Sequence, residues 1–162
     1  RQEKKSLVVS RIFLLKRNSL KKRLHLAINS LSSLLFTIQN PKQALLFYRL
    51  VDNLCNPPQF HYKSRGTSQE LTSQVAKERR HVGRHIGVLL QNIILTVIAR
   101  SNTTNTWSEL NVHLRAASLL IIDLIYGDGL KAVSAGMDSA SRAYLKSLFE
   151  YYKVHGRWSS DD

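Results

Sequence analysis

Val82-Gly-Arg-His-Ile-Gly-Val-Leu-Leu-Gln-Asn-Ile-Ile-Leu-Thr-Val-Ile98 is the stretch that decides the fold of this chain. Its large apolar residues recur at intervals of three and four, the spacing that places side chains on one face of a helix. They are Val82, Ile86, Leu89, Leu90, Ile93, Ile94, Val97 and Ile98. So wide an apolar face predicts a central buried helix, with a bend or break near residues 81–83.

A second apolar stripe precedes this stretch in the chain. It consists of Leu20, Leu24, Ile28, Leu31, Leu35 and Ile38, again at helical spacing. Asn40-Pro41 ends that helix and begins another, since proline suits the first helical turn. The new helix is predicted to run to about Leu54. The Asn-Pro-Pro sequence that follows breaks regular structure, so a loop over residues 55–67 is expected to separate two helical halves.

The chain after residue 98 continues the helical pattern. Apolar spacing predicts a helix over about 110–124, which Gly127-Asp128-Gly129 ends, and a short helix or turn over 130–135. Asp138 is a good N-cap for a closing helix, because its carboxylate accepts hydrogen bonds from free amides and favours the positive end of the helix dipole. Gly156 is predicted to end that helix.

The whole pattern predicts an all-α protein. The 162 residues include only 7 glycines and 3 prolines, so long stretches lack a helix breaker. No alternation of apolar and polar residues is long enough for a sheet. We expect a single helical domain over residues 1–162, either an antiparallel helical bundle or a HEAT-like helical stack.

Positive charge is the most informative bulk property. Lysine and arginine number 24 against 11 acidic residues, a formal net charge of +13. Between Glu3 and Asp52 there is no acidic residue, so the N-terminal half carries the field. Such a field attracts polyanions, which leaves nucleic acid, an acidic protein and an anionic membrane surface as alternatives.

Basic clusters are the best candidates for nucleic-acid contact, because lysine and arginine bind phosphates without reading sequence. The candidates are Lys16, Arg17, Lys21, Lys22, Arg23, Arg79, Arg80 and Arg84. Few aromatic residues lie among them, which argues against a surface that stacks single-stranded bases. A solvated helix face is the alternative interpretation of these charges.

Catalytic signatures are not found in the sequence. His81 and His85 are four residues apart, but the glutamate of a zincin motif is missing and arginines surround the pair. Cys55 is the only cysteine and is expected to be core or loop filler. The longest apolar run, residues 88–99, is shorter than the roughly 20 residues of a membrane span. We expect no enzyme activity, cofactor, metal, small-molecule substrate or membrane partner.

The closing segment carries a resemblance to a known family. It reads Met137-Asp-Ser-Ala-Ser-Arg-Ala-Tyr-Leu-Lys-Ser-Leu-Phe-Glu-Tyr-Tyr-Lys-Val-His-Gly-Arg-Trp158. It resembles the end of the unhealthy-ribosome-biogenesis protein 2 family, also called nucleolar pre-ribosomal-associated protein 2. The matching positions that we take as candidates for partner docking are Asp138, Lys146, Leu148, Phe149, Tyr152, Lys153, Gly156 and Trp158. Phe149 and Arg157 depart from the tyrosine and lysine expected there.

The resemblance implies the C-terminal part of a large helical-repeat protein of the nucleolus. It also implies a non-catalytic scaffold in early assembly of the large (60S) ribosomal subunit. The implied partners are ribosome-assembly proteins, including a DEAD-box helicase complex, with pre-rRNA as a further candidate. The alternative is a stand-alone basic helical module that binds nucleic acid, which rests on the acid-free N-terminal stretch alone.

Overall fold

Helices account for the regular structure in a computed structural model of the chain, which describes residues 17–56, 68–101, 107–125 and 127–155. Within these ranges there are seven α-helices and no strand, so the all-α prediction is confirmed. The helices are α2 (Arg17–Phe36), α3 (Pro41–Cys55), α4 (Ser68–Gly83), α5 (Gly87–Arg100), α6 (Trp107–Ile125), α7 (Asp128–Ala135) and α8 (Ser139–His155).

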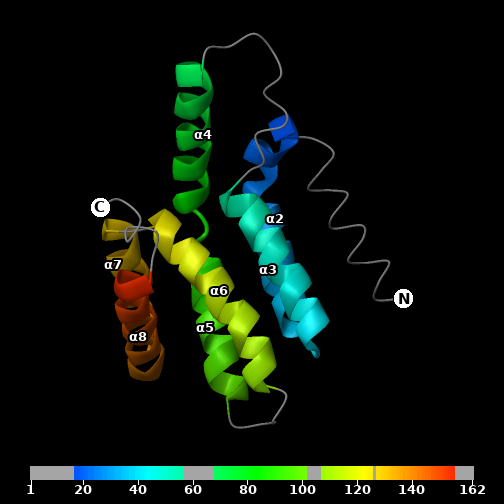
Figure 1. Cartoon of the computed structure of the whole chain (residues 1–162), viewed down its shortest axis with the longest axis vertical. Helices are drawn as coiled ribbons and strands as arrows, with labels where there is room; N and C mark the ends of the chain where they lie inside the picture. Colours follow the sequence, from blue (N-terminus) through cyan, green and yellow to red (C-terminus); the bar gives the residue numbers. More distant parts are fainter. Residues whose placement is uncertain (1–16, 57–67, 102–106, 126, 156–162) are drawn as a thin grey trace.

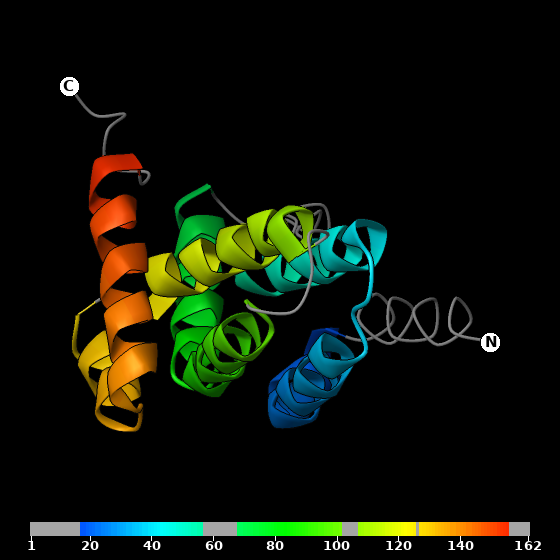
Figure 2. The same ribbon diagram turned by 90° about the horizontal axis from the view of Figure 1, so that it is seen from below.

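The helices stack in pairs (Figure 1). Helices α2 and α3 form one pair, and α5 and α6 form the next, so that α2 packs on α5 and α3 packs on α6. Seen from below, α2 and α5 lie in one layer and α3 and α6 in the other (Figure 2). Helices α7 and α8 each contact both α5 and α6 on the side away from the first pair. This side-by-side packing of helix pairs fits both predicted forms, an antiparallel bundle and a HEAT-like stack.

Helix α5 is the centre of the core, as its apolar face predicted. Leu89, Leu90, Ile93 and Ile94 have no exposed surface, and the helix contacts α2, α6, α7 and α8. The predicted apolar stripe is nevertheless split between two helices. Val82 lies in the last turn of α4 and is only partly buried, whereas the stripe from Leu89 onward lies in α5, which begins at Gly87.

The predicted break between α4 and α5 is confirmed as a turn over residues 84–86, with the two helix axes 54° apart. The backbone at Gly87 comes so close to α7 that a Cβ atom there would lie 2.6 Å from Val133 Cγ2. Glycine is therefore required for this approach. No single described helix has the length and apolar composition of a membrane span, although Val75–Gly83 and Gly87–Arg100 pass such a test as a bent pair.

Capping explains where the helices begin. Asn40 Oδ1 accepts a hydrogen bond from the Gln43 backbone amide at 3.0 Å, with Pro41 in the first turn of α3. Asp138 Oδ1 accepts one from the Ser141 amide at 2.7 Å, so the predicted N-cap of α8 is confirmed. Gly127, with φ of 85°, separates α6 from α7, which begins at Asp128 rather than at residue 130 as predicted.

The predicted loop over residues 55–67 was placed one residue too early. Cys55 is the last residue of α3 and only 1% exposed, since the apolar side of α3 continues to its final turn. The Asn56 amide then donates to the Asp52 carbonyl at 2.7 Å. Residues 57–67, with the two prolines, lie outside the described ranges.

Polar side chains of α5 join it to its neighbours. Arg100 Nη1 donates to the Ile38 carbonyl at 2.6 Å and Arg100 Nη2 to the Phe36 carbonyl at 2.9 Å. Both carbonyls lie at or just beyond the end of α2, where they lack helical partners. Gln91 Nε2 donates to the Val133 carbonyl of α7 at 3.0 Å. These hydrogen bonds fix the order and register of the stack.

Candidate interaction surfaces

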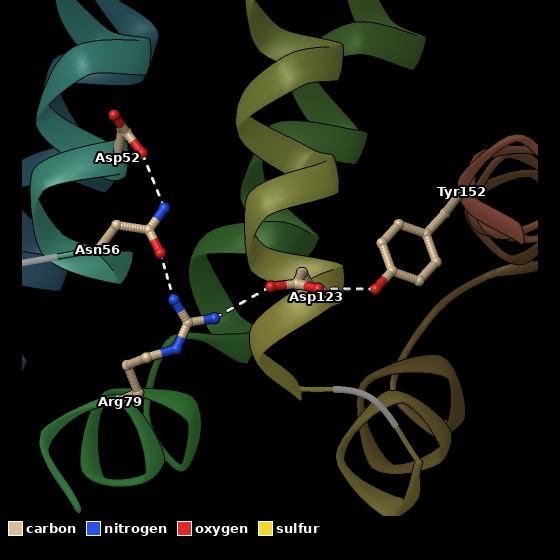
Figure 3. Close-up of polar contacts among 5 residues, drawn as sticks. All are labelled: Asp52, Asn56, Arg79, Asp123 and Tyr152. Carbon is tan, nitrogen blue, oxygen red and sulfur yellow. Dashed lines mark hydrogen bonds and ion pairs between the residues drawn. The ribbon is translucent and has the colours of Figure 1, made fainter. Parts of the chain in front are cut away.

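A polar network joins four helices around Asp123 of α6 (Figure 3). Asp123 Oδ2 lies 3.0 Å from Arg79 Nη2 of α4, and Asp123 Oδ1 accepts a 2.7 Å hydrogen bond from Tyr152 Oη of α8. Arg79 Nη1 also donates to Asn56 Oδ1, and Asn56 Nδ2 donates to Asp52 Oδ1 at 2.9 Å. One carboxylate therefore links α4 and α8, and through Arg79 it also reaches α3.

Sequence reasoning placed Arg79 among the nucleic-acid candidates, and the structure places its guanidinium inside this network. The side chain is 26% exposed and that of Asp123 is 21% exposed, so solvent screens the pair only partly. The sequence singled out Asn56 only as part of a helix-breaking Asn-Pro-Pro segment, and it did not single out Asp123. Since 44 residues separate the two members of the ion pair, no local pattern could have connected them.

Arg80 of α4 and Arg84, in the turn after α4, are exposed, and so is Lys77, one turn before Arg80. Arg79 and Val82 are instead partly buried. The backbone at Gly83 approaches α6 so closely that a Cβ atom would lie 3.0 Å from the Leu124 carbonyl oxygen. Packing of α4 on α6 thus determines which of the neighbouring arginines points outward.

The N-terminal basic cluster is described only at its end. Arg23 is exposed at a kink in α2, where its φ of −124° and ψ of 16° depart from helical values. Arg17, Lys21 and Lys22 lie in α2, but the structure does not describe their side chains, and Lys16 lies outside the described ranges.

The two histidines of the rejected zincin pattern lie close together. The ring centroids of His81 and His85 are 5.3 Å apart in an edge-to-face arrangement. Among the described residues, no group of three or more His, Cys, Asp or Glu side chains is placed to hold a metal ion. An imidazole pair bordered by arginines is a poor site for a divalent cation.

The family-motif residues of α8 divide into inward and outward positions. Leu148 and Tyr152 are buried at 1% and 6% exposed, so they pack α8 onto the stack. Phe149 is half-buried, with Lys153 Nζ 4.8 Å from its ring centroid. Lys146 is exposed. Burial of α8 against the stack therefore accounts for the aliphatic and aromatic residues at the inward positions.

Asp138 is exposed and serves as the helix cap, whereas Gly156 and Trp158 lie outside the described ranges.

A surface of mixed apolar and cationic character lies across α6 and α8; we call it the α6/α8 face. Its members are Val112, Arg115, Tyr151, Val154 and His155. Arg115 Cζ lies 3.9 Å from the Tyr151 ring centroid, and the His155 ring lies 4.4 Å from the same ring. Val112 and Val154 are 64% and 67% exposed. Sequence reasoning missed this face, because its residues come from two helices about 40 positions apart.

Comparison with known proteins decides the family. A family model, the Urb2/Npa2 family, matches residues 5–161. The chain belongs to the Urb2/Npa2 family. The resemblance noted in the closing segment is thus confirmed and extends over nearly the whole chain. Neither the curated proteins nor the solved structures contain a match.

Urb2/Npa2 proteins are ribosome-biogenesis factors and are not known as enzymes, so this chain has a role in ribosome biogenesis.

Charge on this Urb2/Npa2 chain is distributed unevenly over the stack. Helix α2 contains no carboxylate, and α3 contains only Asp52, which is bound to Asn56. The exposed carboxylates of the described residues lie on α6, α7 and α8, and are Glu109, Asp128, Asp138 and Glu150. The sequence of α2 and α3 is therefore strongly positive, whereas the charges of α6, α7 and α8 are close to balanced. Helices α7 and α8 lie at the other end of the stack from α2 and α3 (Figure 1).

Proposed function

We propose that this chain is a non-catalytic scaffold domain that docks protein assembly factors in early assembly of the large (60S) ribosomal subunit. The observation that carries the proposal is the Urb2/Npa2 family match over residues 5–161. We further propose that it acts in the nucleolus, where ribosome assembly begins, as the C-terminal part of a longer helical-repeat protein. Its partners in this proposal are assembly factors, including a DEAD-box helicase complex, and pre-rRNA.

The shape of the domain supports recognition of partners. The Asp123 network and the Arg100 hydrogen bonds hold the helix pairs in one arrangement, so exposed side chains keep fixed relative positions. A preorganised surface loses little conformational entropy when a partner binds.

The α6/α8 face is the proposed protein-docking surface. It combines exposed aliphatic residues with a tyrosine held between a guanidinium and an imidazole. Tyrosine and arginine are enriched among the residues that dominate protein interfaces, because each buries a large area and offers a polar group. Stacking on Arg115 fixes the Tyr151 ring before a partner arrives.

Affinity purification tests the proposal. The chain is immobilised and exposed to nucleolar extract, and bound proteins and RNA are identified. We expect ribosome-assembly factors, a DEAD-box helicase and pre-rRNA. Recovery should fall when Val112→Ser and Val154→Ser are combined with Tyr151→Ala. Val88→Ser with Leu95→Ser is the matched control, because these residues of α5 are similarly exposed at 54% and 48%. Wild-type chain that recovers no assembly factor contradicts the proposal.

A second candidate, the stand-alone nucleic-acid-binding module, is favoured by one observation, the absence of acidic residues between Glu3 and Asp52. This candidate requires a steep salt dependence of binding and its loss when Lys21, Lys22 and Arg23 are changed together to glutamate. It also requires that purified chain bind nucleic acid while recovering no assembly factor. The same purification therefore separates the two candidates.

A further inference from the structure

We propose that three exposed cations, Lys77 and Arg80 of α4 and Arg84 of the turn after it, bind the phosphate backbone of double-stranded RNA. We call this surface the elbow face. The inference rests on the proposed function in ribosome assembly, because that function makes RNA the polyanion that the domain meets. In this proposal the adjacent residues Arg79 and Arg80 have different roles. Arg79 holds the fold together through Asp123, and Arg80 is available to a ligand.

Lys77 and Arg80 of α4 are three residues apart, so they are neighbours on the surface of the helix. Arg84 follows in the turn after α4 and is exposed like the other two. All three side chains have long, flexible stems. Successive phosphates of one strand can therefore contact successive side chains of the elbow face.

No internal partner neutralises these cations. Within the described ranges, no carboxylate forms an ion pair with Lys77, Arg80 or Arg84. The carboxylate nearest in sequence, Glu78, is half-buried and already has a partner. Asp123, the acidic residue that α4 packs against, is occupied by Arg79 and Tyr152. Asp128, one of the exposed carboxylates of α6, α7 and α8, is bound to Lys131 and so does not pair with the elbow face.

The composition of the elbow face favours nucleic acid over an acidic protein. Protein interfaces are centred on buried aromatic or aliphatic anchors with charges at the rim. Ala76 is the only exposed apolar residue on this stretch of α4. Phosphates, in contrast, are bound by guanidinium and ammonium groups without any apolar contact.

A duplex is favoured over a single strand for a related reason. Proteins that hold single strands stack the bases on aromatic side chains. Helix α4 and the turn after it contain no Phe, Tyr or Trp, and the rings of His81 and His85 pack edge-to-face on each other. Duplex RNA hides its bases and is recognised through phosphates and helical shape. We therefore expect binding that depends on salt and hardly on sequence.

The test compares two variants of the chain that remove equal charge. Arg80→Gln with Arg84→Gln removes two cations from the elbow face. Lys131→Gln with Arg142→Gln, the matched control, removes two exposed cations from α7 and α8. Binding to a short labelled RNA duplex is measured by fluorescence anisotropy between about 50 and 200 mM salt. Helical circular dichroism and melting temperature establish that each variant is folded.

Loss of two phosphate contacts should reduce the slope of log K against log salt by about 1.8, at about 0.9 per contact. Affinity near 0.1 M salt should fall roughly tenfold to hundredfold. The control on α7 and α8 should keep the wild-type slope. Equal effects of both variants would show a diffuse charge effect and overturn the proposal, and so would an unchanged elbow variant. Polyglutamate that competes as well as duplex RNA would assign the face to an acidic protein.

Recovery of assembly factors in the affinity purification shows separately whether the RNA site or the scaffold proposal has failed. An elbow variant that binds RNA normally, while wild-type chain recovers assembly factors, overturns only the RNA site. A wild-type chain that recovers no assembly factor, while the elbow variant loses RNA binding, overturns the scaffold proposal and leaves the RNA site supported.

Discussion

Tyr152 of α8 donates a 2.7 Å hydrogen bond to the same carboxylate of Asp123 that forms a 3.0 Å ion pair with Arg79 of α4. The two contacts use different oxygens of Asp123, so both exist at once. Helix α8 contains the family motif, and α4 carries the basic elbow face. The side chain of Asp123 therefore connects the two parts of the domain to which we assign recognition.

Removal of this carboxylate should destabilise the domain. Asp123→Ala leaves a half-buried guanidinium and a buried phenol without their acceptor, and we expect the free energy of unfolding to fall by about 1–3 kcal/mol. Urea unfolding followed by circular dichroism measures the change. Tyr152→Phe should cost about 1 kcal/mol, because it removes one hydrogen bond and keeps the ring. Asp128→Ala, at a carboxylate 97% exposed, should stay close to wild type. Equal stability of all three variants would show that the network contributes nothing.

The contact at the bend between α4 and α5 predicts an opposite response of two glycines to the same substitution. Gly87→Ala places a methyl group 2.6 Å from Val133 Cγ2, and we expect a loss of about 1–3 kcal/mol through overpacking. Gly129→Ala meets its nearest atom, Ile125 Cβ, at 3.4 Å inside α7. There alanine should stabilise by about 0.5–1 kcal/mol through helix propensity. The melting temperatures of both variants test this prediction. A Gly87→Ala variant with wild-type stability would contradict the close approach of α5 to α7.

Asp138 predicts a pH dependence of stability at the start of α8. The hydrogen bond from the Ser141 backbone amide lowers the pKa of this carboxyl from its ordinary value of 3.8. A carboxyl whose pKa is lower in the folded state stabilises fully above its unfolded pKa and loses that contribution as pH falls through the folded pKa.

The melting temperature of wild-type chain should therefore fall more steeply below about pH 4 than that of Asp138→Asn, since asparagine caps the helix without titrating. Asp138→Ala should melt lower than both at neutral pH. If the melting temperatures of wild type and Asp138→Asn changed with pH in the same way, the charge of Asp138 would have no role in capping α8.

Cys55 should resist thiol reagents in the folded chain. Burial raises the pKa of its thiol to about 12, against smaller opposing effects from Arg79. The thiolate is the reactive form, so little of it exists at neutral pH, and the packed end of α3 also blocks access. We expect reaction with a chromogenic disulfide only after denaturation. Rapid labelling of native chain would show that the final turn of α3 opens readily.

Local patterns predicted the helices well, because their causes are local. The apolar spacing around Ile93 and the cap at Asp138 depend on neighbours a few residues away, and both predictions are confirmed. The helix end at Cys55 was misplaced because burial against other helices extended α3 beyond the point where sequence alone suggested a stop.

The sequence could not predict which of the arginines are buried in contacts and which are exposed. Arg79 and Arg80 are chemically identical and adjacent, and only the packing of α4 on α6 directs the first to Asp123 and the second to solvent. The α6/α8 face was missed for the same reason, since Arg115 and Tyr151 meet only after two helices pack.

Sedimentation of cell extract through a density gradient, followed by detection of this protein and of large-subunit precursor RNA, tests the central claim most directly. We predict that the protein sediments with early large-subunit precursors and shifts to slow fractions when precursor RNA synthesis is blocked. A protein that remains in the slow fractions under both conditions, apart from precursor RNA and assembly factors, would contradict the scaffold role.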